Sequence, residues 1–249
     1  MLRLLCVTAH PDDEAGGFGG ALLHYHRKGV ETSVICLTEG TAATHRGGAA
    51  NSEDLAAMRR REFAASCRML GVTHGEVLSY RDGALERENL VEVTGELVQR
   101  IRRFRPQVVL TFGLEGALTA HPDHSMAAVF ATLAYHWAGR TNRYPEQLGS
   151  LAPHRASKLY YTSALFTLPD RQPASLPPVT AVLDIADCVE IKVAAFKQHH
   201  SQAPLFPLFE NTMRQRGALE MYHLAASVTP GKAEEEHDLF TGIEDEEAR

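Results

Sequence analysis

At 249 residues, with 44% hydrophobic and 22% charged residues, the chain has the composition of one globular domain with a substantial core. No apolar run approaches the roughly 20 residues of a membrane span, and no leader-like segment precedes the first predicted strand, so we expect a cytoplasmic protein without a membrane partner. The net charge of −6 is concentrated in residues 231–249, which hold eight acidic and two basic side chains. The neutral body argues against nucleic acid as a partner.

These features also set the expected domain limits. We expect residues 1–230 to form a single α/β domain, and residues 231–249 to be an acidic, solvated and partly disordered tail, because such a composition buries little. The four cysteines are scattered and form no CxxC pair: Cys6, Cys36, Cys67 and Cys188. Their spacing argues against a thiolate zinc site and fits a reducing compartment.

Apolar runs alternate with amphipathic segments along the chain. The runs predict strands at 2–8, 31–38, 77–80, 108–112, 158–164 and 180–185. Amphipathic periodicity predicts helices at 17–28, 53–70, 88–103, 125–136 and 188–200, the second with Ser52 as a plausible N-cap. Strand–helix–strand units of this length predict an α/β fold, a Rossmann-like, mostly parallel sheet with helices on both faces. The glycine cluster at 16–20 lacks the GxGxxG spacing of a dinucleotide loop.

The turn after the first strand is unusually rich in ionisable residues. Residues 9–14 read AHPDDE, which places one imidazole and three carboxylates within five positions. Carboxylates crowded at a buried strand end repel one another and need partners, a conflict that a bound divalent cation removes. By itself, however, the turn could also be a solvated acidic loop.

A second cluster, HPDH at residues 121–124, follows the strand at 108–112 and precedes a helix. Open α/β sheets place their sites beyond the carboxyl ends of the strands, so the two loops can face each other there. Each motif alone has an ordinary explanation as a surface turn, but the pair together predicts a metal site.

Catalytic zinc sites use three nitrogen or oxygen ligands and leave a position open for water. His10, Asp13 and His124 would supply such a set, with Zn²⁺ favoured and Fe²⁺ or Mn²⁺ not excluded by the residue types. Asp12 would then be free to accept a proton from water. This arrangement is suited to the hydrolysis of an amide.

The second motif holds two further candidate groups. His121 could stabilise a developing oxyanion or protonate a departing amine. Asp123 could hold His121 in the required tautomer, as carboxylates near metal sites commonly do.

The paired motifs resemble those of the PIG-L/LmbE family of zinc-dependent N-deacetylases, and the similarity extends over most of residues 2–204. The resemblance implies a Rossmann-like fold and the removal of acetyl groups from N-acetylglucosamine conjugates, such as thiol precursors or a chitin disaccharide. The metal ligands of the family match His10, Asp13 and His124. Its base matches Asp12, and its electrophilic histidine matches His121.

The resemblance also covers an Arg-x-x-Glu pattern at 59–62, which makes Arg59 a candidate substrate contact. Glu39-Gly40 departs from the Gly-Glu of many bacterial members, and the loop at 39–52 fits no subgroup, so the sugar conjugate is left open. The alternatives are an amidase of a thiol conjugate and a non-catalytic metal-binding module. We expect a small N-acetylated amino sugar as the partner, and a homo-oligomer is compatible with the sequence.

Overall fold

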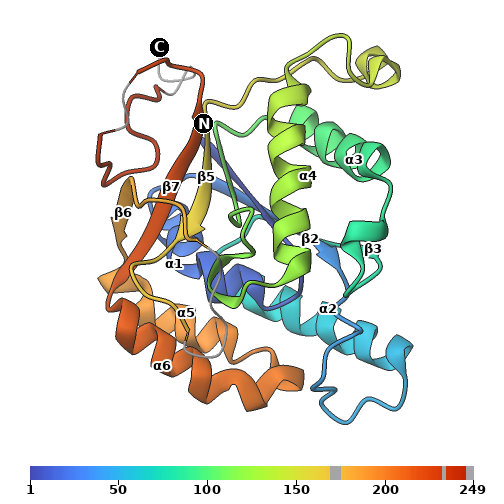
Figure 1. Ribbon diagram of the computed structural model, residues 1–249, viewed down its shortest axis with the longest axis vertical. Coiled ribbons are helices and arrows are strands. Elements are labelled where there is room, and N and C mark those ends of the chain that lie inside the picture. Colours follow the sequence, from blue (N-terminus) through green and yellow to red (C-terminus); the bar gives the residue numbers. More distant parts are fainter. Residues whose placement is uncertain (169–174, 232–233, 245–249) are drawn as a thin grey trace.

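A seven-stranded sheet forms the centre of the structure, a computed structural model that describes residues 1–168, 175–231 and 234–244 (Figure 1). The strands lie in the order β3-β2-β1-β4-β5-β7-β6. The first five are parallel, and β7 is antiparallel to both of its neighbours. Their bounds are β1 Arg3–Thr8, β2 Glu31–Thr38, β3 His74–Tyr80, β4 Val108–Thr111, β5 Lys158–Ser163, β6 Ala181–Asp184 and β7 Leu219–Ser227. This is the predicted Rossmann-like α/β fold.

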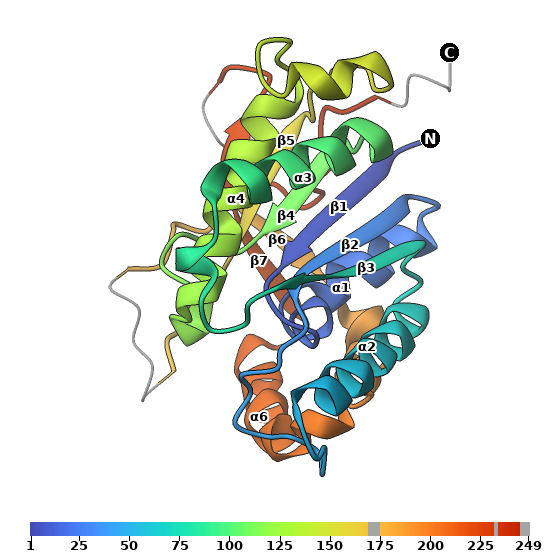
Figure 2. The ribbon, with the colours of Figure 1, turned by 90° about the vertical axis from the view of Figure 1, so that its right-hand side faces the viewer.

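Helices cover both faces of the sheet (Figure 2). On one face α3 packs against α4, and on the other α5 contacts both α1 and α2. The bounds are α1 Asp13–Arg27, α2 Ser52–Met69, α3 Leu90–Phe104, α4 Pro122–Ala138, α5 Val189–Phe196 and α6 Phe206–Arg216. No helix among the described residues is long and apolar enough to cross a membrane.

The structure changes some of the predicted boundaries. α1 begins at Asp13, four residues before the predicted start, so the last two residues of the first motif, Asp13 and Glu14, lie in its first turn. The N-cap of α2 is Asn51, whose side chain accepts the Asp54 N–H at 2.8 Å, and not Ser52. The predicted helix at 188–200 ends at Phe196. α6 and β7 were not predicted, because the 206–227 region lacks a strong periodic pattern.

The glycine cluster in α1 has a packing role. The Glu220 carboxylate of β7 accepts the Gly20 and Ala21 N–H groups at 2.7 and 2.8 Å, and it pairs with the fully buried Lys192 of α5 at 2.5 Å. A Cβ on Gly20 would lie 2.7 Å from a Glu220 oxygen. The glycines therefore let β7 approach the backbone of α1.

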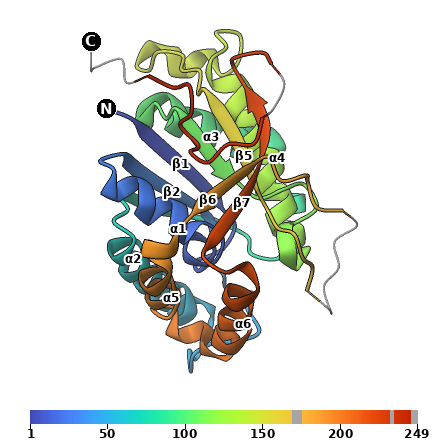
Figure 3. The same cartoon turned by 90° about the vertical axis from the view of Figure 1, so that its left-hand side faces the viewer.

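The C-terminal segment packs against the sheet, so the expectation of a solvated tail is wrong for residues 236–243 (Figure 3). Leu239 and Phe240 are 1% and 7% exposed. Glu236 pairs with Lys158 at 2.5 Å and bridges to Ala181 of β6. Composition suggested disorder because the acidic residues outnumber the two apolar anchors, and those anchors decide the packing.

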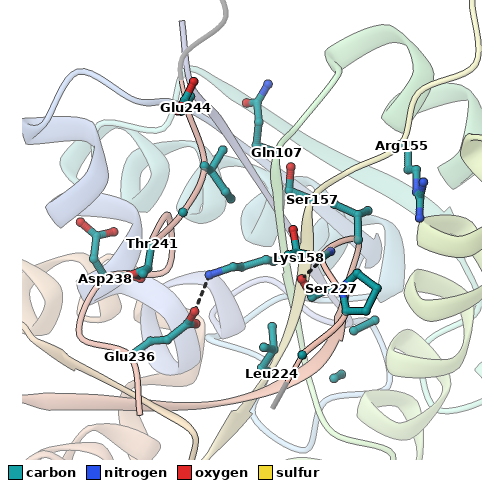
Figure 4. Close-up of a pocket in the computed structure, with 18 of the residues that line it drawn as sticks. Gln107, Arg155, Ser157, Lys158, Leu224, Ser227, Glu236, Asp238, Thr241 and Glu244 are labelled. Carbon is teal, nitrogen blue, oxygen red and sulfur yellow. Dashed lines mark hydrogen bonds and ion pairs between the residues drawn. The ribbon is translucent and has the colours of Figure 1, made fainter. Parts of the chain in front are cut away.

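A cavity of about 1610 Å³ lies between this segment and the amino ends of the parallel strands (Figure 4). Gln107, Ser157 and Lys158 mark those strand ends, and Asp238 and Thr241 come from the C-terminal segment. The sequence motifs follow the opposite, carboxyl ends of the strands.

Candidate metal centre

The two motif loops follow β1 and β4, which are neighbours at the centre of the sheet. The chain progresses from β1 toward β3 on one side and from β4 toward β5 on the other, so the strand order reverses between β1 and β4. Such a reversal opens a crevice at the carboxyl ends of the two strands, which is where ligands bind in this class of fold. The topology therefore brings residues 9–14 and 121–124 together.

Asp13 lies between the two imidazoles predicted to share its metal. Its Oδ2 is 3.5 Å from His10 Nδ1, and its Oδ1 is 3.1 Å from His124 Nε2. Oδ2 also accepts the His10 N–H at 2.7 Å, which fixes the carboxylate at the start of α1. Burial would raise the pKa of Asp13, but His124 and His10 outweigh it and hold the pKa well below its usual value.

The far side of the His10 ring is held by two carboxylates. Its Nε2 is 3.1 Å from Asp82 Oδ1 and 3.3 Å from Asp123 Oδ2. Burial would lower the pKa of His10, but Asp123, Asp13 and Asp82 together hold it well above its usual value. So many carboxylates around one imidazole form a surplus of negative charge that suits a divalent cation.

The His124 ring is fixed in a similar way. Thr119 Oγ1 is 3.1 Å from His124 Nδ1, and the Phe112 ring stacks on the imidazole at 3.9 Å between centroids. Contacts of this kind orient metal-binding histidines. For both His10 and His124, the nitrogen that faces Asp13 is the one left for a metal.

Asp12 has a backbone conformation that is rare for a residue with a side chain. Its φ is 120° with ψ −26°, which costs about 1–3 kcal/mol and must be held by its surroundings. Arg59 Nη2 donates to Asp12 Oδ2 at 2.9 Å. Burial raises the pKa of Asp12 to about 6, although Arg59 opposes the shift. Asp12 is thus close to the range that suits a general base at neutral pH.

Arg59 is 2% exposed and lies under the Asp12 turn. Its guanidinium also donates to the carbonyl oxygens of Pro11 and Gly40, the latter at 2.9 Å. These bonds give Arg59 a role in positioning the first motif, and its contact with substrate stays a prediction. Arg60 and Arg61 are more exposed, in line with an ordinary solvated helix face.

The predicted relation between Asp123 and His121 takes a different form in the structure. The backbone N–H of Asp123, not its carboxylate, donates to His121 Nδ1 at 3.1 Å. The carboxylate instead contacts His10 and accepts the Gly83 and Leu85 N–H groups at 2.7 and 3.1 Å. His121 is therefore assigned a proton on Nε2 when neutral. Burial lowers its pKa, which favours that neutral form.

Among the described residues, two groups of three side chains could each hold a metal ion, because the possible ligand atoms within each group all lie within 4.8 Å of one another. One is His10, His121 and His124, and the other is His10, Asp82 and Asp123. His121 Nδ1 already accepts an N–H, and both carboxylate oxygens of Asp123 already accept backbone N–H groups. Asp13 Oδ1, by contrast, accepts no backbone N–H among the described residues and contacts His124 Nε2. The donor chemistry therefore favours the predicted set of His10, Asp13 and His124.

Sequence reasoning did not assign a role to three residues of this region. Asp82 belongs to the turn after β3, and Glu14 and His199 form a buried pair at 2.7 Å. Glu14 is part of the AHPDDE motif, and His199 lies near the end of the region, residues 2–204, that resembles the PIG-L/LmbE family. No spacing rule links positions 185 residues apart, so only the fold reveals the contact.

Comparison with known proteins gives consistent matches. A family model described as GlcNAc-PI de-N-acetylase (PIG-L) matches residues 5–135. A 1D-myo-inositol 2-acetamido-2-deoxy-alpha-D-glucopyranoside deacetylase of Catenulispora acidiphila is 29% identical, over 96% of this chain and 97% of its own. A mycothiol S-conjugate amidase of Streptomyces coelicolor is 30% identical, over 98% of both chains. The structure of N,N'-diacetylchitobiose deacetylase from Pyrococcus horikoshii aligns with a TM-score of 0.74 and 27% identity, covering 97% of this chain and 86% of that one.

Proposed function

Since this chain belongs to the PIG-L family of GlcNAc-PI de-N-acetylases, we propose that it hydrolyses the acetamide of an N-acetylated amino-sugar conjugate. The observation that carries the proposal is the meeting of His10, Asp13 and His124 next to Asp12. Holding a metal does not require Asp12 or His121. A base and a hydrogen-bond donor beside a ligand set are typical of a hydrolase.

We propose that His10 Nδ1, Asp13 Oδ1 and His124 Nε2 hold one divalent ion, with Zn²⁺ as the first choice for this donor set. Such an ion supplies Lewis acidity, which polarises an acetyl carbonyl and acidifies water. Asp82, Asp123 and Thr119 keep the two imidazoles oriented toward it.

In this proposal Asp12 transfers protons, and His121 stabilises the developing negative charge. Asp12, whose pKa is raised to about 6, is largely ionised at neutral pH and takes a proton from the water that attacks the acetyl carbon. His121 donates its Nε2–H to the oxygen that becomes negative in the transition state. The carbon–nitrogen bond then breaks as the leaving nitrogen takes the proton held by Asp12, which restores the carboxylate; the free amine and acetic acid, which ionises to acetate in solution, are released.

A substrate screen tests the proposal. Purified protein is incubated with N-acetylglucosaminyl inositol, N,N'-diacetylchitobiose and N-acetylglucosamine, with and without added Zn²⁺, and released acetate is measured. We expect acetate from at least one conjugate, at a rate that falls when a chelator removes the metal. The absence of acetate from every N-acetylated sugar would contradict the proposal.

A second candidate function is the hydrolysis of an amide in a thiol conjugate. The relative named as a mycothiol S-conjugate amidase matches this chain over nearly its full length, so the same screen includes an S-conjugate of an N-acetylcysteinyl amino sugar. Release of an amino-sugar fragment without acetate would favour this second candidate.

A further inference from the structure

A buried pair, Glu14 and His199, connects the catalytic turn with the C-terminal half of the chain. Both residues are 0% exposed, and Glu14 Oε1 lies 2.7 Å from His199 Nε2. The other carboxylate oxygen of Glu14 accepts the backbone N–H of Asp12 at 2.9 Å. His199 lies outside the part of the chain that the family model matches, which ends at residue 135.

The hydrogen bond to Glu14 comes from the backbone N–H of Asp12, the residue with the strained conformation. Asp12 has a positive φ of 120°, and its N–H has no helical acceptor because it precedes the first turn of α1. Arg59 holds the Asp12 carboxylate, while Glu14 holds the Asp12 backbone. The direction of the carboxylate depends on both contacts, and only the second depends on His199.

The side chain of His199 makes no second hydrogen bond, among the described residues, that would explain its burial. Its Nδ1 is buried without a hydrogen-bond partner among the described residues, and its Nε2 contacts Glu14 alone. Burying an imidazole with only one of its two nitrogens hydrogen-bonded costs free energy, whereas an apolar side chain in the same place would leave no polar atom unpaired. The contact with Glu14 is thus the feature that sets His199 apart from a packing residue.

We propose that His199 is a positioning residue for the deacetylase reaction, which orients Glu14 so that Glu14 holds the backbone of Asp12 in its positive-φ conformation. This inference rests on the proposed function, because it assigns Asp12 the role of base. Displacing a reacting group by about 1 Å costs about 10²-fold in rate. Loss of the contact should therefore lower kcat and leave KM and metal content unchanged.

The test compares two amides of different reach. In His199→Gln the side-chain N–H₂ can lie near the position of Nε2 and donate to Glu14, whereas in His199→Asn the amide is too short to reach it. We expect kcat of His199→Gln to stay within about threefold of wild type and kcat of His199→Asn to fall about 10–100-fold. His200→Asn, at the exposed neighbouring residue, is the matched control and should behave as wild type.

Metal content, KM and thermal melting are measured on the same samples. Equal kcat values for the two His199 variants, or a loss that follows metal content, would overturn the proposal. Loss of the fold in either variant would make the contact structural and would also overturn it. If wild type releases no acetate from any substrate, the proposed function fails first and the inference falls with it. When wild type is active, the difference in kcat between His199→Gln and His199→Asn decides whether His199 is a positioning residue.

Discussion

The two edges of the parallel sheet differ in how far their ionisable residues are buried. At the carboxyl edge, His10, Asp123 and His124 are at most 8% exposed, and each contacts partners fixed by the backbone. At the amino edge, the cavity of about 1610 Å³ is wide and is lined partly by exposed side chains such as Arg155. Preorganised charges in a restricted space stabilise a transition state better than a large hollow does. We therefore place the chemistry at the carboxyl edge, where the ionisable side chains are buried and held by specific contacts.

The sharpest way to break this assignment is to remove the carboxylate between the two imidazoles. Asp13→Ala should lose the bound metal, since only two of the three proposed ligands, His10 and His124, would remain. Activity should fall at least about 10³-fold, equivalent to roughly 4 kcal/mol of lost stabilisation. Elemental analysis and acetate release are measured together, and the same substitution at the exposed Glu235 is the control. Retention of metal by Asp13→Ala would instead favour the group of His10, Asp82 and Asp123.

A smaller effect separates catalysis from metal binding. Asp12→Asn keeps the shape of the side chain but cannot accept a proton, so the rate should fall about 10²–10⁴-fold while about one metal ion per chain stays bound. Metal content and acetate release are compared in one preparation. A variant that turns over at the wild-type rate would mean that Asp12 serves only to balance the charge of Arg59.

The same comparison explains what the sequence could predict. His10, Asp13 and His124 could be predicted as ligands because local motifs at strand ends converge where the sheet order reverses, and the fold brings these three side chains together. Asp82 and His199 were not assigned roles, because each reaches the site through a contact between distant segments that has no periodic signature. Among the described residues, every strand except β7 and every α-helix except α6 followed from apolar periodicity.

The errors lie mainly where tertiary packing overrides composition. The C-terminal acidic run was expected to be solvated, but Leu239 and Phe240 anchor it. The carboxylate of Asp123 was assigned to His121, two residues earlier in the sequence, whereas folding places it against His10. In both cases a few specific contacts outweigh the average character of the segment.

Removing those anchors should reduce stability more than activity. The double variant Leu239→Ala with Phe240→Ala deletes two buried side chains, one of which packs against Tyr25 at 5.0 Å between ring centroids. Core truncations of this kind cost about 2–5 kcal/mol each, so the melting temperature should fall by roughly 10 °C or more. Glu234→Ala with Glu235→Ala, at exposed positions of the same segment, should shift it little. An unchanged melting temperature would mean that residues 236–243 do not stabilise the fold, as first expected for a solvated tail.

The smallest expected effect concerns the cavity at the amino edge. Arg155 is exposed beside it (Figure 4). A strand of six residues, about 20 Å long, separates this edge from the candidate metal centre. At physiological ionic strength exposed charges are screened over about 8 Å, so Arg155→Ala should not change the field at Asp12. We expect kcat/KM within about twofold of wild type and a stability change within about 0.5 kcal/mol. Steady-state kinetics on the best substrate from the screen makes the measurement. A tenfold loss would mean that the cavity is coupled to turnover, and the contrast between the two edges drawn above would no longer hold.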